Sequence, residues 1–357
     1  MKDPSQLPEL KRFVLPALFV GALFVVLVMR RPDISETDRV VTFQGPTMGT
    51  TYTVKIVTAG LDNAAQSKVD QEIIGALEKV NKAMSTYLRS SELSRFNGHE
   101  SLEPFPVSPA LLSVVNEANR ISDLSNGAFD ITVGPLVDAW GFGPDKEATP
   151  PTPEQVELIR TSVGYTKLLL GDTTLAKTDK HLRCDLSAIA KGYGVERVQD
   201  ALELLGFKNF MIEVGGEVVT RGKRLDGRLW RIGIERPDPT GLSIHRAIPL
   251  NDLAMASSGD YRNYREVDGR RISHTIDPRT GNPVTHRLAS VTVLHKNCMT
   301  ADALATTFSV LGAQEGQKLA EKHDFAALFL IRLPDGRYEE QSTAAFDAYV
   351  NDPEPTP

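Results

Sequence analysis

The stretch NCMTADALATTFSVLG, residues 297–312, predicts a helix with polar side chains near its start. Thr300 is a candidate N-cap, because its hydroxyl can accept a hydrogen bond from a free N–H group of the first turn. Asp302 and Thr306 are four residues apart and therefore share one helix face. Their carboxylate and hydroxyl offer two oxygens to one cation, and Mg²⁺ prefers oxygen ligands. The helix dipole alone also favours an acidic residue here. This stretch by itself therefore does not decide between a metal site and an ordinary helix start.

Three stretches before this helix carry further candidate residues. RRISHTIDPRTGNPV, residues 270–284, is loop-like with a strong turn signal, and its His274 is a candidate general base. IEVGG, residues 212–216, puts two glycines at a strand end, where backbone can approach a ligand. Each has an ordinary alternative, namely a histidine without a catalytic role and a plain strand-end turn.

The third stretch is CDLSAIAKGYGVERV, residues 184–198. Asp185 and Ser187 flank a predicted helix start, which favours anions because its N–H groups point outward. Lys191, one to two turns into that helix, could add a point charge for a phosphate. The order of a P-loop is absent, and Lys191 could equally be a solvated helix charge.

Apolar patterning divides residues 40–347 into strands and helices without a clean linker. A pair of strands around a turn at Gly45–Pro46 is predicted for residues 40–58, and a polar loop with an exposed Tyr87 follows residue 84. Helices are predicted at residues 71–84, from Pro109 to a stop at 126–127, and at 186–205 and 315–322. Strands are predicted at residues 210–214, 217–220, 229–235, 253–257, 288–294 and 326–332.

The N-terminus contains an apolar segment, FVLPALFVGALFVVLVM, at residues 13–29. It carries no charge, it is near the lower limit for a membrane-spanning helix, and it is long for the apolar core of a cleaved signal. No A-x-A-like cleavage site follows it, so we expect an uncleaved signal-anchor helix with an inside N-terminus rather than a cleaved peptide. A lipid anchor on an N-terminal cysteine is excluded, because no cysteine lies nearby.

The composition is typical of a globular protein and argues against a nucleic-acid partner. The chain has 357 residues and a formal net charge of −6, so no basic stripe is left to meet phosphates of DNA or RNA. Its two cysteines, Cys184 and Cys298, form no C-x-x-C motif and no zinc pattern. The sequence leaves open one disulfide outside the cytoplasm or two buried thiols.

Short motifs follow one another along the chain in a characteristic order. They are MGT at 48–50, the loop around Tyr87, GAFD at 127–130, DLSAIAKG at 185–192, EVGGE at 213–217, SSGDY at 257–261, HTIDPRTG at 274–281 and TADALATT at 300–307. This order resembles the ApbE family of FAD:protein FMN transferases over nearly all of residues 40–335. The resemblance implies an α+β fold of mixed, T-fold-related sheets with packed helices, preceded by one N-terminal transmembrane helix.

The resemblance also implies a reaction and its residues. Family members split FAD at its pyrophosphate, release AMP and attach FMN through a phosphoester to a Thr or Ser hydroxyl of a target protein. By position, the side chains of Asp302 and Thr306 and the backbone carbonyl of Ala188 would bind Mg²⁺, and His274 would activate the acceptor hydroxyl. FAD, as the substrate, would contact Met48, Tyr87, Ala128, Phe129, Asp130, Asp185, Lys191 and Ile276.

The implied organisation has four parts. Residues 1–32 would form a cytoplasmic tip and signal-anchor helix, 33–39 a linker, 40–347 the catalytic domain and 348–357 a flexible tail. Many bacterial members are lipoproteins, so the helix would replace the lipid in this chain. The protein would be a single-pass protein of the bacterial inner membrane with its catalytic domain in the periplasm, and its acceptors would be subunits of membrane redox complexes.

The expected mechanism is phosphoryl transfer on a cation-neutralised pyrophosphate. Lys191 would help neutralise a phosphate oxygen, and the acceptor oxygen would attack the phosphorus on the riboflavin side. Tyr87 and Phe129 are candidates for contact with the flat rings, although either could be core or rim. Two alternatives remain: an FAD pyrophosphatase giving FMN and AMP, and a non-catalytic periplasmic flavin-binding protein.

Overall fold

The computed structural model describes residues 37–143, 149–238, 243–259, 264–267 and 270–351. The predicted signal-anchor helix, residues 13–29, lies outside this part of the chain, as do most of the predicted linker and tail. None of the helices formed by the described residues is both long enough and apolar enough to span a bilayer.

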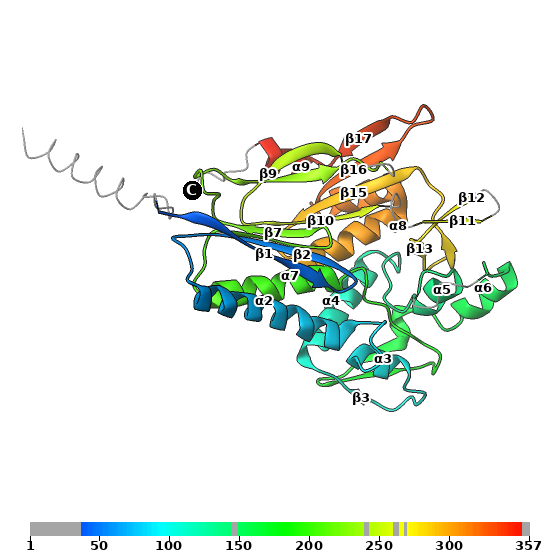
Figure 1. The fold of residues 1–357 in the computed structure, drawn as a ribbon. Coiled ribbons are helices and arrows are strands. Elements are labelled where there is room, and N and C mark those ends of the chain that lie inside the picture. Colours follow the sequence, from blue (N-terminus) through cyan, green and yellow to red (C-terminus); the bar gives the residue numbers. More distant parts are fainter. Residues whose placement is uncertain (1–36, 144–148, 239–242, 260–263, 268–269, 352–357) are drawn as a thin grey trace, which may run out of the picture.

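A large antiparallel sheet forms the centre of the molecule (Figure 1). Its strand order is β1-β2-β6-β7-β10-β15-β16-β17. The strands are β1 (Arg39–Thr47), β2 (Thr50–Thr58), β6 (Phe210–Val214), β7 (Glu217–Arg221), β10 (Ala254–Gly259), β15 (Leu288–His295), β16 (Ala326–Arg332) and β17 (Tyr338–Ser342). All of its neighbours pair antiparallel, whereas we expected mixed sheets. Tight connections such as β1–β2 and β6–β7 enforce this, because parallel neighbours need a long crossover.

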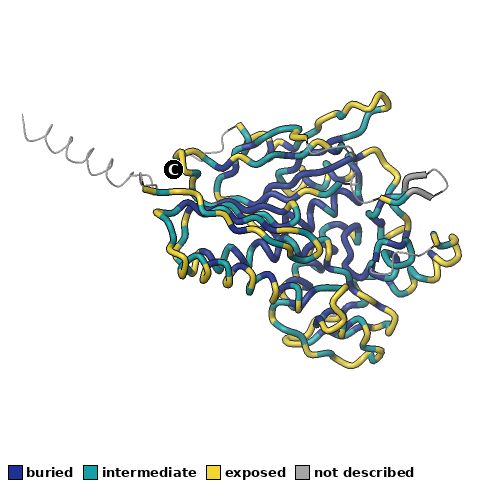
Figure 2. Tube along the Cα trace, viewed as in Figure 1, coloured by how far each residue is buried: buried dark blue, intermediate teal, exposed yellow. Residues whose placement is uncertain are grey.

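Three long helices cover one face of this sheet, namely α2 (Asn63–Met84), α7 (Ala190–Leu204) and α8 (Cys298–Lys322). Side chains alternate between the two faces of a strand. Val293 and Phe329 accordingly pack with Phe308 of α8, whereas Leu294 and Leu328 pack into a separate cluster on the other face. That face is covered by the hairpin of β8 (Trp230–Glu235) and β9 (Ile244–Leu250) and by α9 (Ala344–Asn351). Both faces of the central strands are therefore buried (Figure 2).

Smaller elements pack beside the helical layer. They are α3 (Glu92–Asn97), α4 (Pro109–Leu124), α5 (Gly134–Ala139), α6 (Pro153–Arg160), a 3-10 helix (Tyr165–Lys167) and a small sheet of β3 (Phe105–Pro106), β5 (Thr174–Lys177) and β4 (Leu168–Leu170). Two short hairpins pair β11 (Tyr264–Val267) with β12 (Arg270–Ser273) and β13 (Ile276–Asp277) with β14 (Asn282–Pro283). The prediction of an α+β fold is confirmed.

The β1–β2 turn is not where we predicted it. Gly45 and Pro46 lie inside β1 and pair with β2, and the turn is formed by Met48 and Gly49, with φ of 46° and 74°. Two successive residues with positive φ suit a tight hairpin, because their twist matches that of the strands. We predicted the turn at Gly45–Pro46 because glycine and proline are typical of turns, but proline is also tolerated in an edge strand.

Several helix boundaries also differ from the prediction. The helix α7 begins at Ala190 rather than at 186, so Lys191 lies in its first turn. The helix α8 begins at Cys298, and Thr300 does not cap it: its hydroxyl donates to Glu117 Oε1 at 2.7 Å. The segment predicted as a separate helix at 315–322 continues α8 across a kink at Gly312. The predicted polar loop after residue 84 contains α3, and β9, β11, β12, β17 and α9 were not predicted.

The two cysteines are free and buried. The disulfide alternative is therefore wrong. Cys184 belongs to the core beneath α3 and α4, and Cys298 belongs to the core between α2, α7 and the sheet.

Candidate active site

The starts of α7 and α8 approach each other closely at Gly192. A Cβ atom at this position would lie 2.8 Å from the Cα of Met299, so only glycine allows this approach. The backbone N–H of Gly192 donates to Asp302 Oδ2 at 3.0 Å. The packing of two helices thus brings the DLSAIAKG and TADALATT motifs, more than one hundred residues apart in sequence, into one site.

Lys191 lies between two carboxylates at this junction. Its Nζ is 3.3 Å from Asp302 Oδ1 and 3.3 Å from Glu217 Oε1, at the start of β7. We call Lys191, Glu217 and Asp302 the buried charge cluster: the side chains of Glu217 and Asp302 are 2% and 5% exposed, and that of Lys191 is 26% exposed. The turn between β6 and β7 packs on it, since a Cβ at Gly215 would lie 3.1 Å from Lys191 Cδ.

Electrostatics in the buried charge cluster are strongly coupled. Burial lowers the pKa of Lys191, but Asp302 and Glu217 together raise that pKa by more, so Lys191 is held protonated. Burial raises the pKa of Glu217 to about 8, Asp302 adds to the rise, and Lys191 opposes it. Among the described residues, Glu217 Oε2 has no hydrogen-bond partner. The cluster therefore pairs one ammonium with two carboxyl groups, and burial disfavours the ionised form of one of them, Glu217.

The residues present fit a magnesium ion. Asp302 and Thr306 lie on α8 as predicted, and Thr306 is half-buried. Lys191 Nζ donates to the carbonyl of Ser187 at 3.4 Å, which places the segment with Ala188 beside the cluster. Carboxylate, hydroxyl and carbonyl oxygens are the donors that Mg²⁺ prefers, and Mg²⁺ commonly completes its shell with water and substrate phosphate. No group of three or more His, Cys, Asp or Glu side chains arranged to hold a metal occurs in the described part of the chain.

The tip of the β1–β2 hairpin lies next to this junction. A Cβ at Gly194 of α7 would lie 3.3 Å from Met48 Sδ, and a Cβ at Gly215 would lie 2.8 Å from Thr50 Cγ2. Met48 packs against both of the main core clusters. The predicted FAD residue Met48 thus borders the same site as Lys191.

Tyr87 and Asp185 form a second group. Tyr87 is 64% exposed as a residue, and the pKa of its hydroxyl is raised by partial burial and by the charges of Asp185 and Asp138. Asp185 Oδ1 accepts hydrogen bonds from the N–H and hydroxyl of Ser187. This carboxylate orders the turn that leads into α7, and the exposed Tyr87 ring stands beside it.

The GAFD motif is buried. Asp130 Oδ1 accepts from the N–H and the hydroxyl of Thr132, each at 2.7 Å, and its Oδ2 accepts from Tyr165 N–H at 2.8 Å. Burial raises the pKa of Asp130. Ala128 is 1% and Phe129 2% exposed, and the Phe129 ring belongs to the hydrophobic core. Phe129 thus lies in the core, as one of the two alternatives predicted, and its contact with FAD stays a prediction.

We call residues 274–283 the histidine hairpin. His274 is half-buried and stands edge-on to Phe142, with ring centroids 6.3 Å apart. Ile276 is buried in a small cluster with Leu136, Val156 and Val163. The strand β13 lies against α8, so the hairpin sits on the helix that carries Asp302.

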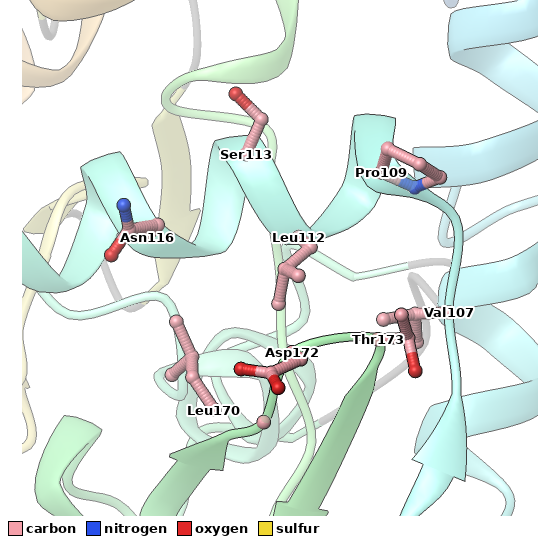
Figure 3. A pocket seen from close by; sticks show the side chains of 9 residues that line it. Val107, Pro109, Leu112, Ser113, Asn116, Leu170, Asp172 and Thr173 are labelled. Carbon is pink, nitrogen blue, oxygen red and sulfur yellow. The ribbon is translucent and has the colours of Figure 1, made fainter.

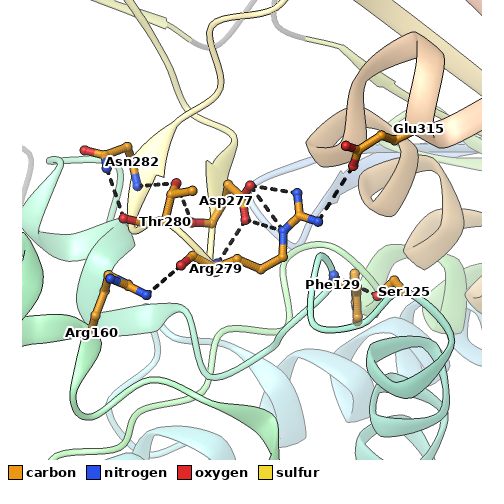
Figure 4. A network of polar contacts seen from close by, with 8 residues as sticks. All are labelled: Ser125, Phe129, Arg160, Asp277, Arg279, Thr280, Asn282 and Glu315. Atoms are coloured by element: carbon orange, nitrogen blue, oxygen red, sulfur yellow. Dashed lines mark hydrogen bonds and ion pairs between the residues drawn. The ribbon is translucent and has the colours of Figure 1, made fainter.

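Polar contacts hold the turn of the histidine hairpin (Figure 4). Arg279 Nη2 is 2.9 Å from Asp277 Oδ2, and its Nη1 is 3.9 Å from Glu315 of α8. Arg160 of α6 donates to the carbonyl of Arg279 at 2.7 Å, and Trp140 Nε1 donates to the carbonyl of Gly281 at 2.9 Å. Trp140, just after α5, and Arg160 of α6 thus bind backbone carbonyls of the turn, and Glu315 of α8 contacts its arginine.

A surface cavity of about 450 Å³ lies elsewhere (Figure 3). It is formed by the start of α4 and the β4–β5 turn, and its lining residues are Val107, Pro109, Leu112, Ser113, Asn116, Leu170, Gly171, Asp172 and Thr173. None of the predicted site residues lines it, so we do not assign it to the reaction.

The structure adds residues that the sequence did not single out. Glu217 was noted only as the end of the EVGGE motif and the start of a predicted strand, and glutamate is rarely fully buried. Trp140 gave no signal, because its role depends on a contact with Gly281, 141 positions away in sequence.

Comparisons with known proteins identify the family of this chain. A sequence model of the ApbE family matches residues 48–329. An FAD:protein FMN transferase of Vibrio cholerae is 48% identical, with 86% of this chain and 92% of that protein covered. The corresponding protein of Haemophilus influenzae is 42% identical, with 92% and 96% covered.

Solved structures show the same fold. The flavin transferase ApbE from Vibrio cholerae superimposes with a TM-score of 0.80 at 44% identity, covering 87% of this chain and 99% of that chain. The apo form of the flavinyl transferase ApbE from Pseudomonas stutzeri has a TM-score of 0.80 at 38% identity, covering 88% and 97%. This chain belongs to the ApbE family.

Proposed function

We propose that this chain is an FAD:protein FMN transferase that moves FMN from FAD to a Thr or Ser hydroxyl of a target protein and releases AMP. The observation that carries the proposal is the buried charge cluster, where α7, α8 and β7 place a lysine and two carboxylates at one point. The relatives that bear this activity in their names cover most of the chain.

Asp302, Thr306 and the carbonyl of Ala188 would hold a magnesium ion. When bound, the ion would neutralise and orient the pyrophosphate of FAD, which repels nucleophiles through its dense negative charge. Lys191 would place its ammonium against a phosphate oxygen. Its position in the first turn of α7 adds the positive end of the helix dipole on the same side.

His274 would accept the proton of the acceptor hydroxyl as its oxygen attacks the phosphorus on the riboflavin side, in line with the departing AMP. Its edge-on contact with Phe142 and the contacts of the histidine hairpin would fix its ring. This step leaves FMN attached through a phosphoester to the acceptor.

FAD would be bound mainly by apolar and aromatic surface and by backbone groups rather than by a ring of polar side chains. Met48 and the exposed Tyr87 would offer apolar and aromatic surface to the flat rings. Ala128, Phe129 and Ile276 are buried and would contribute backbone groups. Asp130 and Asp185 use carboxylate oxygens within the protein, so they would shape the loops that line FAD.

We place the catalytic domain, residues 40–347, in the periplasm, anchored to the bacterial inner membrane by residues 13–29. The acceptors would be subunits of membrane redox complexes, which lie at the same membrane. The anchor is inferred from the uncharged apolar segment at residues 13–29, and the acceptors are those that the resemblance to the ApbE family implies.

The test is flavinylation of membranes prepared from a strain that lacks this chain. Purified enzyme, FAD and MgCl₂ are added, and proteins are separated in denaturing gels. We expect flavin fluorescence that survives denaturation, AMP release, and an FMN adduct on a Thr or Ser by mass spectrometry. AMP and FMN release without any acceptor would instead indicate an FAD pyrophosphatase, and unchanged FAD would indicate a flavin-binding protein.

A further inference from the structure

Glu217 is the member of the buried charge cluster that has no step of its own in the reaction proposed above. It begins β7, its residue is 2% exposed, and its Oε2 has no hydrogen-bond partner in the described part of the chain. Removing a carboxylate from water is unfavourable unless its charge is compensated. Among the described residues, the ammonium of Lys191 contacts it, at 3.3 Å.

Lys191 is placed so that its ammonium reaches both carboxylates. Its stem packs on the turn between β6 and β7, where a Cβ at Gly215 would lie 3.1 Å away. Asp302 is fixed from the other side by the N–H of Gly192 at 3.0 Å. The ammonium is therefore shared between a carboxylate that would bind the cation and one that would not.

A divalent cation on Asp302 and the ammonium of Lys191 would be close neighbours of like charge, because Lys191 Nζ is 3.3 Å from Asp302 Oδ1. With Asp302 as its single carboxylate partner, Lys191 would compete with the cation for the same oxygens. A second carboxylate at the same distance gives the ammonium another partner when the cation arrives.

We propose that Glu217 is a positioning residue that holds the ammonium of Lys191 beside Asp302, so that Lys191 and a divalent cation occupy the site together. This inference rests on the proposed role of Asp302 as a cation ligand. Glu217 acts through its contact with Lys191 and touches neither FAD nor the acceptor.

The experiment measures cation binding rather than turnover. Two variants separate the effect of the contact with Lys191 from the effect of the charge. Glu217→Gln keeps the shape of the side chain and removes its charge. Glu217→Asp keeps the charge and moves it away from Lys191, because the side chain is one methylene shorter. Binding of Mn²⁺ to the purified enzyme is followed by electron paramagnetic resonance at pH 8.5, where the carboxylate of Glu217, with a pKa of about 8, is mostly ionised. We expect both variants to bind Mn²⁺ about tenfold more weakly, as is typical when a group behind a metal ligand is lost.

Glu213→Gln is the matched control. Glu213 lies in the same β6–β7 hairpin and accepts from Gly216 N–H at 2.7 Å, which a glutamine can also do. It should bind Mn²⁺ like the wild type. If Glu217→Asp also binds Mn²⁺ like the wild type, the charge of Glu217 acts through space, and the proposed contact with Lys191 is wrong. If both Glu217 variants bind Mn²⁺ like the wild type, the whole inference is wrong.

Two further variants keep the result interpretable. Asp302→Asn should abolish Mn²⁺ binding, and if it does not, the proposed cation site fails whatever Glu217 does. If a Glu217 variant is unfolded by circular dichroism, Glu217→Gln is repeated in a Lys191→Met background. There it should leave Mn²⁺ binding unchanged, and an equal loss in both backgrounds would contradict action through Lys191.

Discussion

The buried charge cluster and the histidine hairpin are held in different ways. In the cluster, two carboxylates that are at most 5% exposed hold one ammonium between two helices and a strand of the central sheet. In the hairpin, Arg160 of α6 donates to the backbone of the turn, and Arg279 pairs with Asp277 (Figure 4). Trp140, which directly follows α5, donates to the carbonyl of Gly281. The charged groups of the cluster are thus fixed in the core, whereas His274, the proposed base, is carried by a hairpin that is held from outside the central sheet.

This difference has a chemical reason. A site that binds a cation gains from low polarity around it, because charges interact more strongly away from water. A base that accepts a proton from an incoming protein must stay accessible to that protein. We therefore expect changes in the cluster to abolish the reaction and changes around the hairpin to weaken it.

The largest effect is expected for Asp302→Asn. It removes the carboxylate that would hold the cation, and loss of several kcal/mol of charge stabilisation should slow FMN transfer by about 10³-fold or more. The measurement is the initial rate of AMP release with acceptor membranes and magnesium. Asp347→Asn on α9, whose carboxylate accepts from Ser342 at 2.7 Å, is the remote control and should keep the wild-type rate. A wild-type rate in Asp302→Asn would refute the cation assignment.

The next effect is expected for His274→Gln. Without a base, transfer should fall by about 10²–10⁴-fold, the usual contribution of general base catalysis. Binding of FAD, followed by flavin fluorescence, should stay unchanged. His245→Gln changes a histidine on β9 that lies 2.7 Å from Glu340, and it should transfer FMN normally. Equal transfer by both variants would show that His274 is not the base.

The fold was predictable where one local pattern dominated. The strand β6, the helix α4 with its Ser108 cap and the double glycine after β6 follow from alternation, capping and turn chemistry. The β8–β9 hairpin was found only in part and α9 not at all, because they are stabilised by packing on the far face of the sheet. Such contacts leave no short-range pattern in the sequence.

The site was predictable only through the order of its motifs. Asp302 and Thr306 share a helix face by spacing, but nothing in the spacing says that Lys191 and Glu217 meet Asp302. Thr300 shows the limit of local rules: its hydroxyl bonds Glu117 of α4 instead of capping its own helix. Tertiary contacts decided both cases.

A moderate effect is expected for Trp140→Phe, which removes the N–H that donates to Gly281 at 2.9 Å and keeps an aromatic ring. Loss of one hydrogen bond is worth about 1 kcal/mol, so kcat/KM for the acceptor should fall by about fivefold while FAD binding is unchanged. Trp230→Phe removes a similar bond, to the carbonyl of Arg221 at 3.2 Å, from the β8–β9 hairpin. It should leave kcat/KM unchanged, and equal losses in both variants would mean that Trp140 does not position the hairpin.

The smallest effect concerns stability and pH. The pKa of Glu217 is raised from 4.5 to about 8 in the folded protein, chiefly by burial. The folded state then binds more protons than the unfolded state between these values, so the stabilisation from protonated Glu217 is complete below about pH 4.5 and is lost as the pH rises through 8. Glu217→Gln does not ionise. Its Tm relative to the wild type should therefore increase by several degrees from pH 5 to pH 8.5 in metal-free buffer. Glu339→Gln, at an exposed position on β17, should show a constant difference. A constant difference for Glu217→Gln as well would mean that the carboxylate is ionised throughout, with Lys191 rather than burial controlling the cluster.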